Sequence, residues 1–297
     1  MERALVTGVS GPIGSALRTY LESQGARVIR LLRGPVREAE QISWDPLQPL
    51  APALVSGFDA VIHLAGETVA GRWSEPKRKS IRESRVQGTT HLAAALAQTQ
   101  TRPRVFICAS AIGYYGNRGD EVLTETSAAG KGFLAEVCLE WEAASRIAAD
   151  AGIRTANLRF GLVLSPRGGA LARMILPFKL GLGGKIGDGQ QWWSWVHVED
   201  IVGAVHHALQ NTSLSGPVNM VAPNPVRCDE FTQVLASVLH RPAFLSVPAF
   251  AVRLALGKMA ATELLLSSAR VQPARLESAG YAFRFPELRG ALEDLLG

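Results

Sequence analysis

The chain contains no long hydrophobic run. No stretch of about 18 consecutive apolar residues occurs, which argues against a membrane-spanning helix. Met1 leads almost directly into the strand-like segment RALVTG, without the charged, apolar and small-residue regions of a secretory signal. From these two absences we expect a cytoplasmic protein that does not enter a membrane.

Cysteine is scarce and is not spaced like a ligand or disulfide pattern. Cys108, Cys138 and Cys228 are far apart, each in an apolar or helical context, and no Cys-x-x-Cys or Cys/His spacing occurs. We therefore expect buried free thiols and no metal site.

Concentrated charge is also missing, although the net charge is +5. The only dense basic run is PKRKSIR at 76–82, whereas a nucleic-acid-binding face needs a continuous basic surface with interleaved aromatic residues. We expect no nucleic-acid partner, and we interpret the run as a solvated helix face or as a surface suited to a polyanionic cofactor. The content of 47% hydrophobic and 19% charged residues is ordinary for a globular protein with a sizeable core.

A glycine-rich turn near the start is the first positive signal. In RALVTGVSGPIGSALRTYLESQGARVIRLLR an apolar run ends at Thr7, and a helical apolar period then continues until Gly25. This predicts strand, turn, helix, strand. Three glycines alone are a weak signal, but in this context a dinucleotide site is favoured over a chance turn. The expected contacts are Thr7, Gly8, Gly11, Pro12, Ile13 and Gly14.

Each residue of this turn has an expected task. Gly8 permits the tight turn, Gly11 lets the backbone approach a pyrophosphate, and Gly14 allows close packing of helix on strand. Pro12 suits the first turn of a helix, where its missing N–H has no partner.

The end of the second strand, ARVIRLLR, indicates which dinucleotide is bound. An NAD site usually has a carboxylate here for the ribose 2′-hydroxyl, whereas this strand ends in Leu32 and Arg33. NADP(H) is therefore favoured, with Arg33 as the candidate for the 2′-phosphate. The alternative is that Arg33 is an ordinary surface arginine.

Strand and helix continue to alternate. This pattern predicts an α/β fold with a doubly wound parallel sheet and with ligands beyond the carboxyl ends of the strands. Leu64, Ala65, Ser110 and Val163 fall at these ends. The expected elements are a strand at 58–66, a helix at 74–98, a strand at 104–111, a helix at 132–152 and a strand at 152–165.

The second half predicts a smaller domain. The segment LPFKLGLGGKIGDGQQWWSWVH has five glycines and three tryptophans in 22 residues, which suits a mobile or irregular lid over a pocket. Its tryptophans either stack on a planar or sugar-like substrate or are core aromatics, and we interpret His197 as structural. PVNMVAP predicts a strand, and CDEFTQVLASVLH, AFAVRLALG and TELLLSSARV predict helices. We expect a Rossmann domain at 1–165, to which 195–222 returns, and a substrate or lid domain at 166–194 and 223–297.

Several motifs together resemble the extended short-chain dehydrogenase/reductase superfamily. They are TGVSGPIG, HLAG, the strand-end Ser110 before YYG, and WVHVEDIVGAV. The longer segments HLAGETVAGRWSEPKRKSIRESR, FLAEVCLEWEAA and LRFGLVLSPRGGALARMILPFKLGLGGKIGDGQQWWSWVHVEDI are similar to its atypical branch, the "epimerase family" or nucleoside-diphosphate-sugar epimerase-like proteins. The resemblance covers nearly the whole chain, including FPELRGALEDLL. It implies NADP(H) held by the glycine loop, Arg33, Leu64 and Ala65. Gly66, Arg85 and Val163 are further candidate contacts with the cofactor.

The resemblance also exposes a departure. Typical members use a Ser, a Tyr and a Lys, and the lysine and the oxidised nicotinamide lower the pKa of the tyrosine. Ser110 matches the serine, but Leu134 and Cys138 occupy the tyrosine and lysine positions in the register anchored on Glu142. Arg85 stands where an Asn is common. Leucine exchanges no protons, and an apolar helical cysteine has its pKa raised rather than lowered.

The catalytic candidates that remain are Ser110, Tyr114 and Tyr115, with Glu67 at another strand end. The alternatives are non-catalytic roles: the tyrosines could cap the sheet edge, and Glu67 could cap a helix or turn. For Arg85 the alternative is pairing with cofactor phosphate or ribose. Two hypotheses follow: an NADP(H)-dependent oxidoreductase or epimerase-like protein acting on a small molecule, or a catalytically silent NADP(H)-binding sensor or scaffold. The sequence names neither the substrate nor the oligomeric state.

Overall fold

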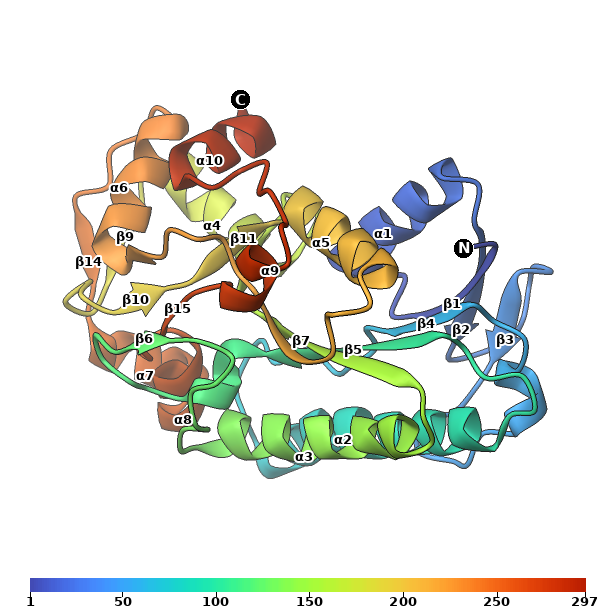
Figure 1. The fold of residues 1–297 in the computed structure, drawn as a ribbon. Helices are drawn as coiled ribbons and strands as arrows, with labels where there is room; N and C mark the ends of the chain where they lie inside the picture. Colours follow the sequence, from blue (N-terminus) through green and yellow to red (C-terminus); the bar gives the residue numbers. More distant parts are fainter.

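A computed structural model describes residues 1–297 and has a seven-stranded parallel sheet at its centre (Figure 1). The strand order is β12-β7-β5-β4-β1-β2-β3, and every neighbouring pair is parallel. The predicted doubly wound sheet is confirmed. Its strands are β1 (Arg3–Thr7), β2 (Arg27–Leu32), β3 (Gln41–Ser43), β4 (Ala60–His63), β5 (Val105–Ala111), β7 (Arg154–Phe160) and β12 (Gly216–Met220).

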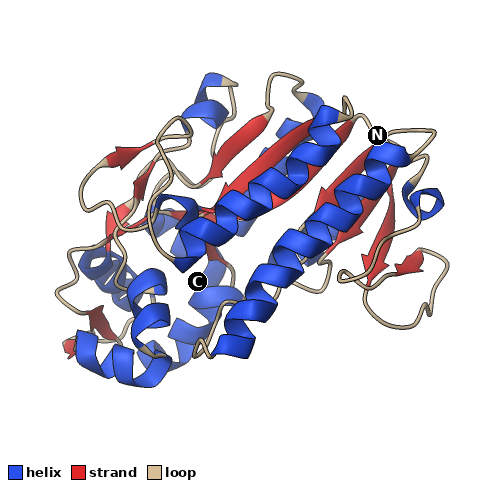
Figure 2. Ribbon diagram, turned by 90° about the horizontal axis from the view of Figure 1, so that it is seen from below, coloured by secondary structure: helices blue, strands red, loops and turns tan.

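Helices cover both faces of this sheet. α1 (Pro12–Ser23) and α5 (Val198–Gln210) lie on one face, and α2 (Glu75–Gln98) and α3 (Phe133–Asp150) on the other, where they lie side by side (Figures 1 and 2). Alternate residues of β1 serve the two cores: Val6 packs in the cluster with α1 and α5, whereas Leu5 packs in the cluster with α2. Both faces of these strands are buried, which explains their continuous apolar runs.

Three helices begin where a polar side chain binds the free N–H groups of the first turn. The Ser74 side chain accepts from Lys77 N at the start of α2, and His197 Nδ1 accepts from Glu199 N at the start of α5. At the start of α3 the acceptor is distant in sequence, because the Glu263 carboxylate accepts from the N–H groups of Phe133 and Leu134.

The strand predicted at 152–165 is two strands. β7 ends at Phe160, and β8 (Leu162–Leu164) pairs instead with β11 (Trp195–His197). The chain turns out of the sheet at Gly161, where a Cβ would lie 2.4 Å from the carbonyl oxygen of Ser194. Val163 therefore belongs to β8 and not to the edge of the seven-stranded sheet.

The predicted irregular lid is mostly regular, so that expectation was wrong. It contains the end of α4 (Gly169–Lys179), β9 (Gly184–Ile186), β10 (Trp192–Trp193) and β11. This segment is ordered by pairing with strands that are distant in the sequence. β9 pairs with β14 (Leu245–Val247), and β10 pairs with β13 (Val226–Arg227). The glycines permit close approach, since a Cβ on Gly184 would lie 2.1 Å from the Leu245 carbonyl oxygen.

The remaining elements are β6 (Val122–Leu123), α6 (Cys228–Val238), α7 (Ala249–Leu256), α8 (Lys258–Leu264), β15 (Arg270–Val271), α9 (Ala274–Ser278) and α10 (Leu288–Leu296), with short 3₁₀ turns η1 (Pro52–Val55) and η2 (Ile112–Tyr115). α6 and α10 pack in a third apolar cluster that includes Trp195, Phe231 and Leu292. β6 and β15 belong to a smaller cluster around Tyr115, and α8 belongs to one around Trp73. The helix predicted at TELLLSSARV is wrong beyond its first three residues, because α8 ends at Leu264 and the last two residues pair as β15 with β6.

The three tryptophans and His197 are accounted for by contacts within the protein. Trp195 is fully buried, Trp193 packs edge-on against Phe231, and Trp192 lies against two arginine side chains. His197 is buried at the start of α5 and lies 4.0 Å from the ring centre of Phe285. The three cysteines are buried and free, as predicted. None of the helices combines the length and the apolar composition that crossing a bilayer requires.

Candidate functional site

The glycine loop lies at the carboxyl end of β1, the strand whose neighbours are β2 and β4. Strand order reverses here, because β2 and β3 lie on one side of β1 and β4 and β5 on the other. In open α/β sheets such a switch point is where a crevice for ligands forms. The sequence-predicted residues of the loop and of the β4 end are therefore brought together.

The three glycines of the loop differ in whether the structure could accommodate a side chain at their position. Gly8 has φ +72° and would place a Cβ 2.7 Å from the Leu64 backbone, and Gly14 would place one 2.3 Å from the Gly8 carbonyl oxygen. These two are required by the packing of the loop. Gly11 has ordinary backbone angles, φ −77° and ψ 164°, and a Cβ there would meet only the Gly8 carbonyl oxygen at 3.4 Å. Gly11 is thus the glycine that leaves open space above the loop.

Thr7 holds the end of β4 rather than facing the crevice. It is fully buried, and its hydroxyl accepts from the N–H groups of Leu64 and Ala65, both at 3.0 Å. With both acceptor sites used, the hydroxyl donates to Nδ1 of His63, 2.8 Å away. The Nε2–H of His63 then donates to Thr89 at 3.1 Å. This chain of hydrogen bonds fixes His63 as a neutral imidazole, and burial lowers its pKa to about 4.

This arrangement predicts a loss of stability in acid. An unfolded His63 protonates below its ordinary pKa of 6.5, whereas the folded one resists protonation until about 4. Between these values the unfolded state binds more protons, so the free energy of unfolding falls as pH falls, by about 3 kcal/mol over the interval. The free energy of unfolding, measured with denaturant at several pH values, should depend less on pH in His63→Asn than in the unaltered chain. Equal slopes would contradict the neutral buried state.

Arg33 follows the last residue of β2, Leu32, and is exposed. Its guanidinium has no hydrogen bond or ion pair within the protein, and no carboxylate ends the strand. Glu67 is close enough for Arg33 to influence its ionisation, but its carboxylate binds Lys77 at 2.5 Å. That hydrogen bond lowers the pKa of Glu67, so this carboxyl is ionised and is poorly suited to donate a proton.

A segment that the sequence did not single out also borders the loop. A Cβ on Gly168, at the start of α4, would lie 3.5 Å from the ring of Pro12. Ile13, Leu64 and Val163 all pack against the same apolar cluster beneath. The start of α4 therefore forms a second wall beside the glycine loop, although β8 is outside the central sheet.

At the end of β4, Gly66 lies against a charged side chain. A Cβ on Gly66 would be 3.2 Å from Cζ of Arg85, which projects from α2. The Nη1 group of Arg85 donates to the carbonyl oxygens of Glu67 and Ile81. The guanidinium thus lies directly behind the strand end.

The end of β5 contains a buried hydrogen-bond network. Ser110 donates to Oε1 of Glu142 at 2.8 Å, and both oxygens of Glu142 accept from Arg159, at 2.7 and 2.8 Å. Arg159 also donates to the hydroxyl of Tyr115, which donates to Asn219 at 2.7 Å. Although burial lowers the pKa of Arg159, pairing with Glu142 leaves it above its ordinary value.

These contacts bear on the predicted catalytic residues. Ser110 and Tyr115 are 2% and 0% exposed, and burial raises the pKa of Tyr115. Both hydroxyls serve the network, which favours the structural alternative for them. Tyr114 is half-buried, its hydroxyl has no hydrogen bond within the protein, and its ring centre lies 3.4 Å from Cζ of Arg159.

The two positions that replace the usual acid–base pair lie beside this network. Leu134 packs over Gly113 in η2: a Cβ added at Gly113 would lie 3.1 Å from the Cβ of Leu134. Cys138 donates a weak hydrogen bond to the Ala111 carbonyl oxygen at 3.7 Å. Burial raises the pKa of Cys138 to about 11, so its thiol is neutral, as the apolar context of the sequence suggested.

Sequence reasoning missed Arg159 as a functional neighbour. The available signal was a charged residue within the apolar run of β7, since a buried charge requires a partner. Glu142 was used only to set the register of α3. Nothing in the sequence indicated that these two residues pair.

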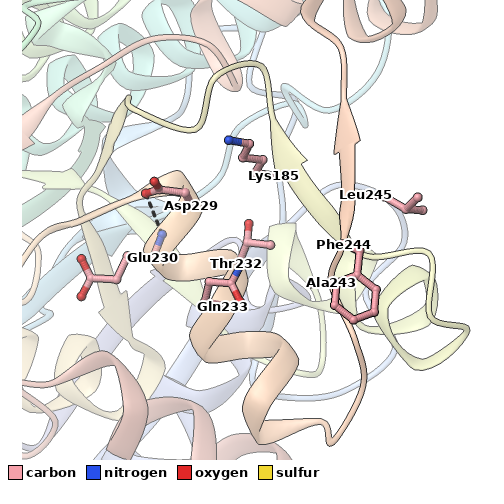
Figure 3. Close-up of a pocket in the computed structure, with 8 residues that line it drawn as sticks. All are labelled: Lys185, Asp229, Glu230, Thr232, Gln233, Ala243, Phe244 and Leu245. Atoms are coloured by element: carbon pink, nitrogen blue, oxygen red, sulfur yellow. Dashed lines mark hydrogen bonds between the residues drawn. The ribbon is translucent and has the colours of Figure 1, made fainter.

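A cavity of about 500 Å³ opens elsewhere, between β9, α6 and the segment leading into β14 (Figure 3). Its lining mixes both charge signs with exposed apolar groups, including Lys185, Asp229 and Phe244. None of the predicted dinucleotide-binding residues lines it, so it is a separate feature of the molecule.

Comparison with known proteins adds sequence matches over most of the chain. Residues 4–221 match a family model described as the NAD dependent epimerase/dehydratase family. Residues 247–295 match a second model, described as a domain of unknown function, DUF1731. The epimerase family protein Mb2239 of Mycobacterium bovis is 41% identical over 289 residues, covering 97% of this chain and 95% of that protein.

Two further matches extend the comparison. The chloroplastic epimerase family protein SDR39U1 homolog of Arabidopsis thaliana is 38% identical, over 98% of this chain and 86% of that protein. The crystal structure of human epimerase family protein SDR39U1 with NADPH has a TM-score of 0.91 and 34% identity, and 99% of each chain is covered.

Proposed function

Because this chain belongs to the NAD dependent epimerase/dehydratase family, we propose that it binds NADP(H) in the crevice at the ends of β1, β2 and β4 and acts as an oxidoreductase or epimerase-like enzyme on a small molecule. The resemblance inferred from the sequence is confirmed at the level of the family. The observation that carries the proposal is that two neighbouring strand ends present free space above Gly11 and an exposed Arg33 with no partner within the protein.

The residues present fit such a cofactor. Gly11 leaves room for a pyrophosphate at the start of α1, where free backbone N–H groups favour an anion. Pro12 and Ile13 continue this surface, Leu32 and Arg33 border the adenosine side, and Leu64, Ala65, Gly66 and Val163 border the other. The human relative was crystallised with NADPH, which supports the same choice here. We expect a cytoplasmic protein, although the Arabidopsis relative is named as chloroplastic.

When bound, NADPH supplies a hydride, and the protein must then provide a proton. We assign this task to Tyr114, because its hydroxyl is the one free group among Ser110, Tyr114 and Tyr115. Substrate would approach from the smaller domain, which we place at 166–194 and 223–297. The second candidate function is a catalytically silent NADP(H) sensor. The apolar Leu134 and the neutral Cys138 favour it.

The cofactor proposal is tested at the 2′-phosphate. Arg33→Ala should weaken NADPH binding by about 10- to 100-fold, since a charge-assisted hydrogen bond contributes roughly 1.5–3 kcal/mol. NADH binding should change little, because NADH has no 2′-phosphate. Calorimetric titration of the cofactor-free protein with both nucleotides measures this difference. Equal losses would remove Arg33 from the 2′-phosphate site.

The choice between enzyme and sensor is tested by NADPH consumption against a panel of carbonyl compounds and sugar nucleotides. Turnover that is lost in Tyr114→Phe, with NADPH affinity retained, supports the enzyme. Tight NADPH binding with no turnover across the panel favours the sensor.

A further inference from the structure

The Arg85 guanidinium is held in a fixed place while three of its five N–H donors are unused. Both N–H groups of Nη1 are bound, to the carbonyl oxygens of Glu67 at 2.9 Å and Ile81 at 3.1 Å. Nε and Nη2 have no acceptor within the protein, and both keep accessible surface. The guanidinium is therefore oriented by the backbone and presents a free donor edge.

The charge of Arg85 has no carboxylate partner. The nearest one, on Glu67, binds Lys77, and no carboxylate oxygen lies within 4.0 Å of Arg85. Arg159 shows the contrast, because its guanidinium, which is also removed from solvent, is held by both oxygens of Glu142. Charges removed from water are normally paired. An oriented but unpaired guanidinium beside a ligand crevice indicates that a ligand provides the acceptor.

The surroundings of Arg85 place it on one side of the crevice. Gly66, at the end of β4, lies over its guanidinium, and the ring centre of Trp141 lies 5.1 Å from its Cζ. Cys138 is close enough for the two groups to influence each other's ionisation. These neighbours lie toward β5, whereas Arg33 lies toward β2, on the opposite side of β1.

We propose that Arg85 binds the nicotinamide half of the dinucleotide through Nε and Nη2, and supplies there the positive charge that position 138 lacks. This inference rests on the proposed NADP(H) function. Arg85 in place of the usual Asn and Cys138 in place of the usual Lys are then one change: the cation beside the nicotinamide comes from α2 instead of α3. A lysine at position 138 would bring two cations together in a partly buried site, which Coulomb repulsion disfavours. The neutral thiol of Cys138 avoids that repulsion.

The test compares NADPH with adenosine 2′,5′-bisphosphate, which carries the adenine half and the 2′-phosphate but no nicotinamide. In calorimetric titrations, Arg85→Gln should weaken NADPH by about 10- to 100-fold and leave the bisphosphate unchanged. Arg85→Lys keeps the charge and should weaken NADPH less than Arg85→Gln. Because bisphosphate binding needs a folded crevice, it also reports the integrity of each variant.

Arg82→Gln is the matched control. Arg82 lies three residues earlier on α2 and pairs with Glu136 and Glu140 of α3 at the surface, so neither ligand should be affected. Unchanged NADPH affinity in Arg85→Gln would overturn the inference, as would an equal loss for both ligands, which indicates a structural role. If the unaltered chain binds neither ligand, the proposed function itself fails, and this inference fails with it.

Discussion

Gly11→Val is expected to abolish dinucleotide binding while leaving the protein folded. The backbone of Gly11 is extended, with φ −77°, and a Cβ there meets only one protein atom within 4 Å. A side chain at this position is therefore compatible with the fold, but it fills the space above the loop. NADPH affinity should fall by more than about 100-fold, which corresponds to roughly 3 kcal/mol. The free energy of unfolding should stay the same or rise by up to about 1 kcal/mol, because the unfolded chain loses freedom.

Gly14→Ala is the control that separates packing from binding. A Cβ at Gly14 would lie 2.3 Å from the Gly8 carbonyl oxygen and 2.8 Å from Val9 Cα, so the loop backbone must move. This variant should lower thermal stability as well as affinity. Unchanged NADPH binding in Gly11→Val, measured by calorimetry, would show that the glycine loop is not the cofactor site.

Glu142→Gln is expected to destabilise the protein by about 3–5 kcal/mol, the cost of leaving a buried charge without its partner. Arg159 is 2% exposed and depends on both Glu142 oxygens. Glutamine offers one acceptor and turns an N–H₂ group toward the guanidinium. Ser110 also donates to Glu142, so the β5 end should loosen with it. Denaturant unfolding measures the effect.

Two further variants test that explanation. Glu140→Gln removes an exposed carboxylate on the same helix whose partner is Arg82, and it should cost only about 0–1 kcal/mol. Arg159→Met added to Glu142→Gln removes the orphaned charge and should recover part of the lost stability. A small effect of Glu142→Gln alone would mean that the network is not what holds the β5 end.

Much of the fold could be predicted from the sequence, because local patterns fixed it. The continuous apolar runs of β4 and β5 are typical of strands buried on both faces, and the period of Leu17 and Leu21 marks the buried stripe of α1. The family resemblance and the glycine loop were equally visible. The predictions failed where a contact distant in sequence determines the local structure. Ser194 lies against Gly161, where the predicted single strand divides, and β14 pairs with β9 in the segment predicted to be irregular.

The candidate site shows the same division. The sequence by itself determined which residue types stand at the strand ends: three glycines, an arginine after β2, and no tyrosine or lysine on α3. These are properties of chain position and need no contacts to be read. Only the tertiary structure decided that Ser110 and Tyr115 are bound into a buried network with Arg159, and that Arg85 is unpaired. Whether a polar group is free or satisfied depends on partners brought close by folding, and the chain order does not specify them.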